Sequence, residues 1–370
     1  MTEVDDIRAQ ALTVAAGWAP ADQPESWRLT AALFTAIADH DELLAALSVV
    51  PPDRLPALLA SASIAFLARR DRPQPLAGYF PAPGGPQPPF DTGFAAAAAA
   101  FISARLPDIA AICRTHRYQM NEVARCTQIA LGIAAAEMAG PVAHVDLGTG
   151  AGLGLQLDRY RYEIAGTGTG PSPASLTLTC ELRGERQPPR PQLPSITWRA
   201  GIELSPVNLD DAASRAWLLA CAPPESSALA RLAAAIRLAR LSPARIIAGD
   251  VVEALPGLLD AVPPDLPVIV TDAYLAVFLP PAQRAKLIEI LSSASRSRPV
   301  TWISLDPLVP LGPSGRDSAQ GLALPDSLVA DYQQRGVFAV LGVRTFDRAG
   351  EGGRLLGRSH PSGQWIEWLE

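Results

Sequence analysis

The residues of this chain that most clearly could do chemistry are the alternating glycines in residues 145–154, VDLGTGAGLG. A short apolar strand leads into them, Asp146 lies at its exit, and Gly148, Gly150 and Gly152 occupy every second position. Glycines at this spacing let the backbone turn tightly and pass close to a ligand, because no Cβ intrudes. The carboxylate of Asp146 would repel a pyrophosphate and attract a cation. The run therefore predicts a loop that binds a small molecule carrying positive charge.

A dinucleotide-binding loop is the main alternative, and its spacing does not fit. That fingerprint is G-x-G-x-x-G, in which the third glycine permits close packing of helix on strand. Counted from Gly148 the third position is Leu153, and counted from Gly150 it is Leu155. The pattern present, D-x-G-x-G-x-G, resembles the first motif of class I methyltransferases that use S-adenosylmethionine (SAM). SAM carries an ammonium and a sulfonium and no phosphate, so it suits this loop. A plain structural glycine turn is the remaining alternative.

Three more acidic residues follow later apolar segments, each at the exit of an expected strand. They are Glu203, Asp250 and Asp272. In an open α/β sheet, ligands bind at the carboxyl ends of the strands, where the strand order reverses. We therefore expect these acids to lie around one site. The alternative for each is a solvated strand end or a helix N-cap.

With SAM as the ligand, each acid would have a physical role. Asp146 would face the amino-acid end of the cofactor, and Glu203 would accept both ribose hydroxyls. Asp250 would accept from the adenine amino group while neighbouring apolar residues sandwich the ring. Asp272 would touch the amino-acid end or the acceptor. The residues predicted to bind the cofactor are Asp146, Gly148, Thr149, Gly150, Gly152, Glu203, Asp250 and Val251.

A second group of polar residues lies in residues 118–125, YQMNEVAR. Glu122 and Arg125 are three apart and could pair on one face of a helix. The segment is either an ordinary capped helix start or a cover over the amino-acid end of SAM or over the acceptor. Residues 158–162, DRYRY, follow the glycine loop, and an aromatic face there could contact a sulfonium. The candidates for a catalytic role are Tyr118, Asn121, Glu122, Tyr160 and Asp272.

The periodicity of apolar residues indicates the elements that must position these side chains. Up to about residue 70 the chain reads as several helices, and a Pro- and Gly-rich connector at 72–89 precedes a helix at 94–112. Another helix opens at Tyr118 and runs to about Met138. From residue 144 strands and helices alternate, as in a parallel sheet covered by helices. The expected strands are 143–147, 196–204, 246–248, 268–270, 300–305, 337–346 and 363–369, and the expected helices among them are 212–221, 226–241 and 281–295.

The last two strands flank glycines at 350–353 and read as an antiparallel pair that closes the sheet. About fifty residues separate Gly154 from Glu203, where a plain unit needs roughly twenty. The excess, about 163–195, reads as an insertion beside the site, either a strand pair or lid with an alternating strand at 175–180, or a disordered excursion. We expect an α/β fold, with a class I SAM-methyltransferase-like Rossmann sheet that is mostly parallel and ends in an antiparallel hairpin. The expected domains are a helical N-terminal domain, 1–117, and a SAM-binding domain, 118–370.

Composition limits the classes of protein and partner. The 370 residues carry a formal net charge of −6, which argues against a general binder of nucleic acid. The four cysteines and four histidines have no zinc-site spacing, so we expect no metal site and no disulfide framework. The start is acidic where a signal peptide would be basic, and Pro or charge interrupts the apolar stretches before 18 residues. We expect a cytoplasmic protein without a membrane partner, whose helical region serves as a lid, an acceptor-site wall or a homodimer interface.

Several segments together resemble a mostly actinobacterial family that is catalogued only as a domain of unknown function. They are residues 119–125 (QMNEVAR), 150–153 (GAGL), 157–162 (LDRYRY), 201–206 (GIELSP), 217–218 (WL) and 249–255 (GDVVEAL). The resemblance covers nearly the whole chain and implies no particular reaction. This chain has Met120 where the family has threonine, and DLGTG at 146–150 where the family has a glutamate-led, less glycine-rich version. These departures move it toward the methyltransferase pattern.

Three functions follow from these expectations. The first is a methyltransferase that takes SAM and a small-molecule acceptor. The second is a cyclase or lyase with SAM as its sole substrate, which closes the aminobutyrate arm and releases methylthioadenosine. The third is a non-catalytic SAM-binding or scaffold protein. Of these, we expect methyl transfer.

Overall fold

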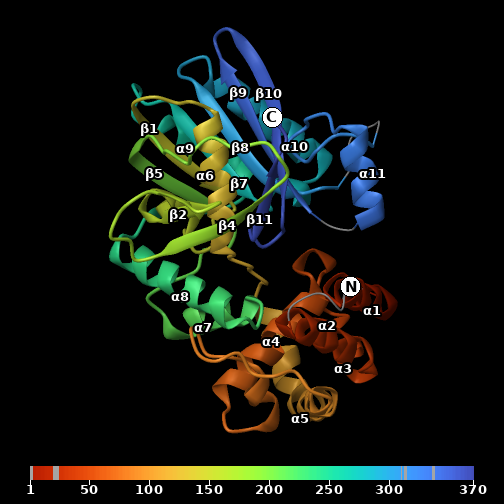
Figure 1. Cartoon of the computed structure of the whole chain (residues 1–370). Helices are drawn as coiled ribbons and strands as arrows, with labels where there is room; N and C mark the ends of the chain where they lie inside the picture. The colour runs from red at the N-terminus through yellow and green to blue at the C-terminus, as the bar shows by residue number, and fades with distance from the viewer. Residues whose placement is uncertain (1–2, 20–24, 310, 312–314, 336–337) are drawn as a thin grey trace. The chain divides into compact units, whose positions relative to one another are not determined.

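The computed structural model describes residues 3–19, 25–309, 311, 315–335 and 338–370, in which the chain forms two compact units (Figure 1). The helical unit comprises residues 1–121 and 208–233, and the sheet unit comprises residues 122–207 and 234–370. A boundary at residue 117 alone leaves out the second segment of the helical unit. That segment belongs there because Trp217, Ala220 and Cys221 are buried in the helical core.

The helical unit is built from amphipathic helices around one apolar core. In α3 the apolar spacing places Leu43, Leu44 and Leu47 on one face, and all three are fully buried. The second segment is held by polar contacts as well, because the Arg69 guanidinium donates to the carbonyl of Leu219 at 3.0 Å. The helices of this unit are α1 (Val4–Trp18), α2 (Glu25–Ala38), α3 (Asp41–Leu47), α4 (Pro56–Arg70), α5 (Gly93–Thr115), α7 (Ala212–Cys221) and the first half of α8 (Ser226–Leu241), with 3-10 turns η1 (Pro52–Arg54) and η2 (Pro75–Tyr79).

Helix α5 (Gly93–Thr115) is the long apolar helix of this unit. Its 23 residues include an 18-residue stretch of mean hydropathy 1.5, so by length and composition it is apolar enough to cross a membrane. Arg105, Pro107 and Asp108 interrupt this stretch as expected, but its alanines keep the mean hydropathy high in spite of them. A core helix passes the same test, and Phe94, Ile102 and Ile109 are buried in the helical core.

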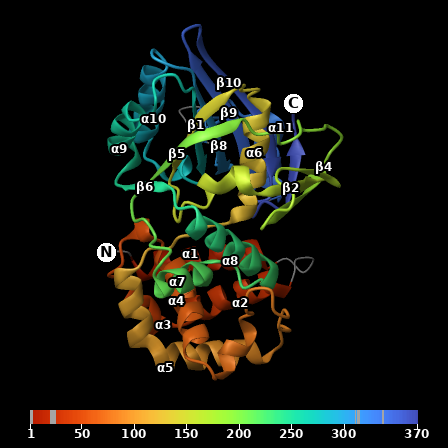
Figure 2. The same cartoon turned by 90° about the vertical axis from the view of Figure 1, so that its left-hand side faces the viewer.

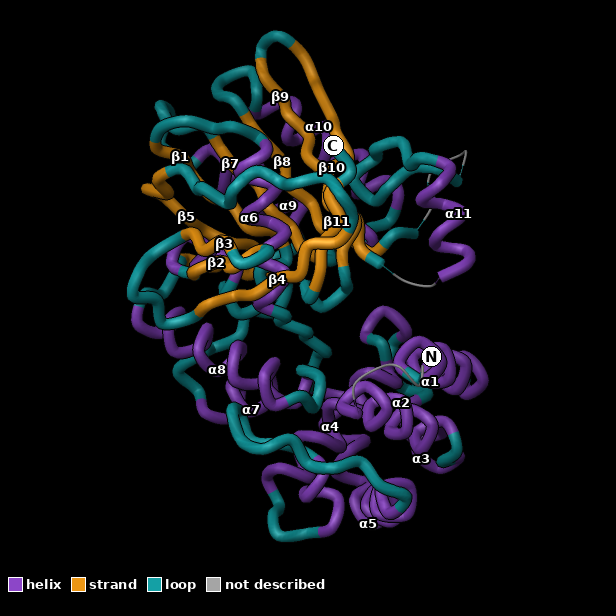
Figure 3. The backbone as a smooth tube through the Cα atoms, in the orientation of Figure 1, coloured by secondary structure: helices purple, strands orange, loops and turns teal. Residues whose placement is uncertain are grey.

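The sheet unit contains one large mixed sheet, so the expected α/β class with a mostly parallel sheet is confirmed (Figure 3). Its strand order is β3-β2-β4-β11-β10-β9-β8-β7-β1-β5-β6. The strands are β1 (Pro141–Leu147), β2 (Arg161–Ile164), β3 (Thr167–Thr169), β4 (Thr177–Arg183), β5 (Ser195–Glu203), β6 (Arg245–Ala248), β7 (Val268–Ala273), β8 (Val300–Pro307), β9 (Ala339–Asp347), β10 (Gly350–Ser359) and β11 (Trp365–Trp368).

Five neighbouring strands are parallel, and their order reverses at β1. From β1 the chain moves one way to β5 and β6, and then returns to the other side of β1 for β7 and β8. This is the first five-strand order of a doubly wound sheet, 3-2-1-4-5, with its switch point between β1 and β7. In the register, Leu147 of β1 lies opposite Ile202 of β5 and Asp272 of β7. The carboxyl ends of these strands therefore meet at one edge.

Helices cover both faces of this sheet (Figure 2). On one face lies α6 (Cys126–Ala135), so close that a Cβ on Gly132 would be 2.5 Å from Cγ2 of Ile303. On the other, α9 (Val251–Asp260) and α10 (Pro281–Ala294) bury their leucines against Trp302 and its neighbours. A further helix, α11 (Asp326–Arg335), packs Leu328 with Phe338 and Val340.

The helix expected from Tyr118 begins later. Residues 118–122 are not helical, and a 3-10 turn, η3 (Val123–Arg125), leads into α6. The carboxylate of Glu122 caps this turn by accepting from the backbone N–H of Ala124 at 3.0 Å. A residue that accepts from the first turn of a helix lies outside that helix, which accounts for the later start.

The closing hairpin exists, but its turn and its strands differ from the expectation. It pairs β9 with β10, and the turn is at 348–349, where Asp347 accepts from two backbone N–H groups. The glycines at 350–353 belong to β10 because they pair with β9, and a Cβ on Gly353 would be 2.5 Å from Leu322. The segment expected at 363–369 contains β11, which pairs with β10 and with β4. Residue 337, the start of another expected strand, lies outside the described residues.

The insertion at about 163–195 extends the sheet. The strand expected at 175–180 is β4, and its buried and exposed side chains alternate as a half-buried strand requires. It pairs in parallel with β2, which forms an antiparallel pair with β3. Of the alternatives open from the sequence, the structure has strands that join the same sheet beyond β11.

Candidate functional site

The glycine loop follows β1 at the switch point of the sheet. Gly148, Gly150 and Gly152 have φ of +63°, +58° and +73°, a region that other residues rarely adopt. Two further glycines have close neighbours, since a Cβ on Gly154 would be 2.6 Å from Oδ2 of Asp146 and one on Gly201 would be 2.5 Å from Cγ2 of Thr149. The loop therefore requires glycine at 148, 150 and 152 for its backbone angles, and close packing requires glycine at 154 and at 201 in β5.

The element after the loop is short. It is a 3-10 helix, η4 (Gly154–Arg159), and β2 follows at once. A phosphate-binding loop leads into an α-helix, whose first N–H groups and dipole hold the anion. A six-residue 3-10 helix offers much less of that field. The loop therefore lacks the α-helix N-terminus that would bind the pyrophosphate of a dinucleotide.

Asp146 is buried beneath the loop and is bonded at both oxygens. Its Oδ2 accepts from the hydroxyl of Thr149 and its Oδ1 from that of Thr271, each at 2.6 Å. Because the Thr271 hydroxyl donates to Asp146, it accepts in turn from Nε2–H of His144 at 2.8 Å. Burial raises the pKa of Asp146 to about 6, although the two hydroxyls oppose this and the charges of Asp272 and Glu203 add to it. Burial also lowers the pKa of His144 to about 3, so this imidazole is neutral.

The exits of β5 and β6 carry the two acids predicted to hold the nucleoside. Glu203 is half-buried, and its two oxygens accept from the backbone N–H groups of Gly150 at 2.9 Å and Ser205 at 3.1 Å. Asp250 caps α9, since its Oδ1 accepts from the N–H groups of Val252 and Glu253. The N-cap alternative therefore holds for Asp250. Its Oδ2 is free of hydrogen bonds to the described residues, and Val251 beside it is buried.

The exits of β7 and β8 bring two more acids together. Asp272 is almost fully buried, and its Oδ2 accepts from Nε1–H of Trp302 at 2.7 Å. Asp306, equally buried, accepts from the hydroxyl of Ser304 at 2.9 Å. Burial and the nearby charge of Asp306 raise the pKa of Asp272 far above its usual range, and burial raises the pKa of Asp306 too. For both carboxyl groups, burial therefore disfavours the ionised form, and at Asp272 the nearby carboxylate of Asp306 adds to this.

Beside this pair, an arginine stacks on a strained tyrosine. Tyr274 follows β7 with a φ of +64°, and the guanidinium of Arg125 lies 3.7 Å from the centre of its ring. Arg125 is held from the other side, because its Nε donates to the carbonyl of Pro361 at 2.8 Å. Non-glycine residues with positive φ cluster at functional sites, where the surrounding structure maintains the strain.

The remaining predicted catalytic residues lie in different surroundings. Tyr160 is fully buried, and its hydroxyl donates to the carbonyl of Leu153 at 2.8 Å, so it supports the glycine loop from within the core. Glu122 caps η3, as described above. Tyr118 and Asn121 belong to the helical unit, where the Tyr118 hydroxyl donates to the carbonyl of Cys221 and the Asn121 amide to that of Gln119.

Three residues of the sheet edge were not among the sequence candidates. They are Thr271, Tyr274 and Asp306. Asp306 had a usable signal, because it follows an apolar strand as the other four acids do, and the expected strand stopped one residue short of it. The roles of Thr271 and Tyr274 depend on a hydroxyl bond across two strands and on a backbone angle, which no local pattern indicates. Among the described residues, no three His, Cys, Asp or Glu side chains gather as metal ligands would.

Comparison with known proteins identifies a family without an assigned reaction. Residues 15–368 match the family described as an uncharacterized protein conserved in bacteria, DUF2332, and the chain belongs to that family. The expectation of a family of unknown function over nearly the whole chain is thus confirmed. No curated protein matches the chain.

Proposed function

We propose that this member of the DUF2332 family binds SAM at the carboxyl edge of its parallel strands and transfers the methyl group to a small molecule. The finer fold assignment belongs to the same proposal, namely a variant of the class I methyltransferase sheet. In this variant the glycine loop leads into a 3-10 helix, and extra strands lengthen the sheet.

The observation that carries the proposal is the row of acids at the switch point. Each of five neighbouring parallel strands ends in a carboxyl group, and these are Asp250, Glu203, Asp146, Asp272 and Asp306 in sheet order. An edge of this kind repels phosphate and favours a ligand with positive charge, such as an ammonium or sulfonium. The short η4 points the same way, because it offers little field for an anion.

The oxygen atoms that remain open fit an adenosyl group. Oδ2 of Asp250 is without a bond to the described residues, and each carboxylate oxygen of Glu203 has a lone pair left after its one backbone bond. Glu203 would accept the ribose hydroxyls and Asp250 the adenine amino group, beside the apolar Val251. Asp146 would act through its charge, because both its oxygens hold threonine hydroxyls.

In this proposal the protein mainly orients and encloses the reactants. Bound SAM supplies an electrophilic methyl group, and transfer is favoured when the acceptor is held in line with it. The loop glycines let the backbone approach the ligand, while Asp146 and Glu203 fix the loop from both sides. Asp272 and Asp306 are buried and accept hydrogen bonds from Trp302 and Ser304, so we assign the pair to positioning the β7 and β8 exits around Tyr274.

Calorimetric titration of the full chain with SAM, S-adenosylhomocysteine and NAD tests the proposal. We expect the first two to bind and NAD not to bind. Glu203→Gln should weaken SAM binding by about tenfold or more, since hydrogen bonds to a charged group contribute about 1.5–3 kcal/mol. Glu253→Gln is the matched control, because Glu253 is exposed on the first turn of α9 and its removal takes away the same charge.

Two results would overturn it. Binding of NAD without SAM would assign the loop to dinucleotides after all. Release of methylthioadenosine from SAM in the absence of any acceptor would replace methyl transfer by closure of the aminobutyrate arm. Incubation with SAM alone and with a pool of small-molecule acceptors, followed by mass spectrometry, distinguishes methylthioadenosine from S-adenosylhomocysteine.

A further inference from the structure

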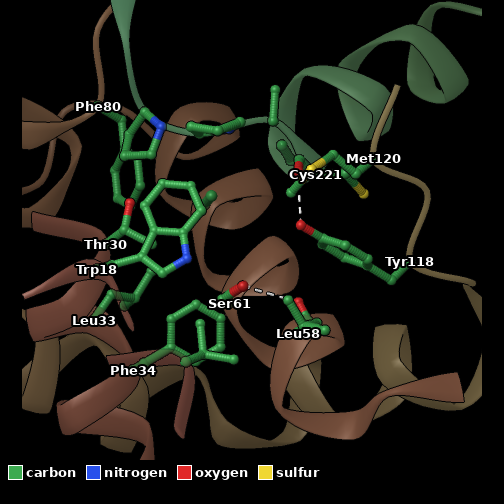
Figure 4. Close-up of a pocket in the computed structure, with 16 residues that line it drawn as sticks. Trp18, Thr30, Leu33, Phe34, Leu58, Ser61, Phe80, Tyr118, Met120 and Cys221 are labelled. Atoms are coloured by element: carbon green, nitrogen blue, oxygen red, sulfur yellow. Dashed lines mark hydrogen bonds between the residues drawn. The ribbon is translucent and has the colours of Figure 1, made fainter. Parts of the chain in front are cut away.

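The helical unit contains a cavity of about 160 Å³. Its lining comes from four helices and from three segments, which follow η2, α5 and α7. Seen in Figure 4, Trp18, Phe34 and Phe80 lie on one side and Tyr118 and Met120 on the other. The floor is buried, because Leu33, Phe34, Ala65, Phe80 and Ala220 are at most 5% exposed. The mouth is formed by residues that are partly exposed, Trp18 and Tyr118 among them.

The walls carry no net charge. None of the described residues that line the cavity is acidic or basic. Besides the indole N–H of Trp18 and the thiol of Cys221, the polar side-chain groups are hydroxyls whose protons are donated to backbone carbonyls. The Ser61 hydroxyl donates to Leu58 at 2.9 Å, the Thr30 hydroxyl to Ser26 at 3.0 Å and the Tyr118 hydroxyl to Cys221 at 3.1 Å. A charged ligand would lose its hydration here without compensation, so the occupant is neutral.

Aromatic side chains are concentrated in this lining. Aromatic residues make up 6% of the chain, yet four of the sixteen lining residues are aromatic. They come from separate parts of the helical unit, Trp18 from α1, Phe34 from α2, Phe80 after η2 and Tyr118 after α5. Rings prefer to meet other rings edge to face or offset, which favours a flat ring over an alkyl chain of similar volume.

The size of the cavity limits the ligand further. An apolar cavity of about 150 Å³ is known to stay dry and to bind benzene. A volume of about 160 Å³ therefore accommodates one six-membered ring with a small substituent. We propose that the helical unit binds a neutral, monocyclic aromatic compound, or the aromatic ring of a larger molecule, between Trp18, Phe34, Phe80 and Tyr118.

This inference stands apart from the proposed use of SAM. Every lining residue belongs to the helical unit, and every residue assigned to SAM belongs to the sheet unit. A ring-binding site without SAM binding, or SAM binding without a ring-binding site, is therefore a distinct experimental result. Titration of each variant below with SAM separates the two.

Fluorine NMR of 4-fluorotoluene with the full chain tests the site directly. We expect the resonance to broaden and shift on addition of protein, and toluene to reverse this. Methylcyclohexane should compete about two- to tenfold less well, because it has a similar volume and no ring quadrupole. Benzoate should not compete, because its carboxylate would be desolvated.

Two substitutions that fill the cavity locate the binding. Ala65→Leu adds three carbon atoms to the buried wall, and Ala222→Leu adds them at the half-exposed mouth, where folding is less at risk. Each should weaken 4-fluorotoluene binding at least tenfold. Ala96→Leu is the matched control, since it places the same atoms on the exposed face of α5 and should bind as the unmodified protein does.

The proposal is overturned by any of four outcomes. The unmodified chain does not bind 4-fluorotoluene at millimolar concentration, or both cavity-filling variants bind it unchanged. Methylcyclohexane competes as well as toluene, which would indicate an alkyl site. Benzoate competes better than toluene, which would indicate a charge that the described lining does not contain.

Discussion

At the scale of single residues, the raised pKa of Asp146 predicts how the free energy of unfolding depends on pH. Its pKa is raised from 3.8 to about 6 by burial, so the folded protein holds this proton more tightly than the unfolded chain. The resulting stabilisation is present at low pH and is lost as the pH rises through 6. Against Asp146→Asn, the free energy of unfolding of the unmodified protein should fall by about 2.4 kcal/mol between pH 4 and pH 7.

Urea denaturation at several pH values measures this difference. The substitution also disturbs the threonine hydrogen bonds, but that effect is an offset without pH dependence. Parallel stability curves for the two proteins would mean that Asp146 has an ordinary pKa in the folded state.

Gly154 makes a second prediction at this scale. A Cβ there would be 2.6 Å from Oδ2 of Asp146, so Gly154→Ala must displace the carboxylate that organises the loop. We expect a loss of about 1–3 kcal/mol in the free energy of unfolding. Gly257→Ala is the control, because Gly257 lies inside α9 with no atom within 4 Å of its Cβ position. That change should be neutral or stabilise by up to about 1 kcal/mol. Equal losses in both variants would contradict the close packing of the loop.

The residues of the candidate site were predictable where their role depends on local sequence. Glycine spacing and an acid after each apolar segment placed Asp146, Glu203, Asp250 and Asp272 at strand exits, and the structure has all four there. Sequence could not show that Asp146 and Asp272 are saturated by internal partners. Those partners, Thr271 and Trp302, are brought to them by the register of neighbouring strands. Tyr160 was predicted to be a catalytic residue whose aromatic face contacts a sulfonium, whereas its side chain is fully buried and donates to the carbonyl of Leu153.

At the scale of elements, Asp250 has two roles that can be separated. As the N-cap of α9 it accepts from two N–H groups, and as a candidate ligand residue it offers its second oxygen. Asp250→Ala should cost about 1 kcal/mol in stability, and Asp250→Ser should cost much less because serine is also a good cap. If Asp250 contacts the ligand, both variants should lose SAM affinity, as calorimetry would show. Full affinity in the serine variant would restrict Asp250 to capping.

Most elements followed from periodicity, and the failures have physical causes. Helices α7 and α8 begin and end where their apolar spacing does. The start of α6 was placed too early because polar residues occur in the non-helical segment before a cap, here 118–122, as well as in the first turn after one. The glycines at 350–353 were taken for a turn, although they pair with β9, and Gly353 makes room there for the side chain of Leu322. The 3-10 form of η4 was not foreseen either, since six residues carry too little periodicity to distinguish it from an α-helix.

At the scale of the whole molecule, the four cysteines make a prediction about reactivity. All four are buried and free, two in the helical unit and two in the sheet unit. Burial raises the pKa of Cys113 to about 11 and those of Cys180 and Cys221 to about 12, and it raises the pKa of Cys126 as well. Because the thiolate is the reactive form, a disulfide reagent at pH 8 should titrate almost none of them in the native protein and all four in denaturant. A rapid reaction of one thiol in native buffer would contradict the burial of that residue.

The division of the chain into units was the least predictable feature at this scale. Local patterns found α7 correctly, but nothing in its sequence says which core it joins. That choice depends on Trp217 and Cys221 meeting residues more than a hundred positions earlier. Contacts between residues this far apart in the sequence cannot be predicted from the apolar periodicity of a few helical turns.

Because the two units alternate along the chain, the helical unit cannot be completed until much of the sheet unit has been synthesised. The helical unit needs residues 208–233, and these are synthesised only after residues 122–207, which belong to the other unit. At about 5–20 residues per second, on the order of ten seconds pass between the appearance of residue 121 and that of residue 233. During this interval α4 lacks the partner that covers it, and the wall formed by Ala220 and Cys221 does not yet exist. The aromatic cavity is therefore a late product of synthesis, and a nascent chain that stops before α7 would display its apolar floor to chaperones.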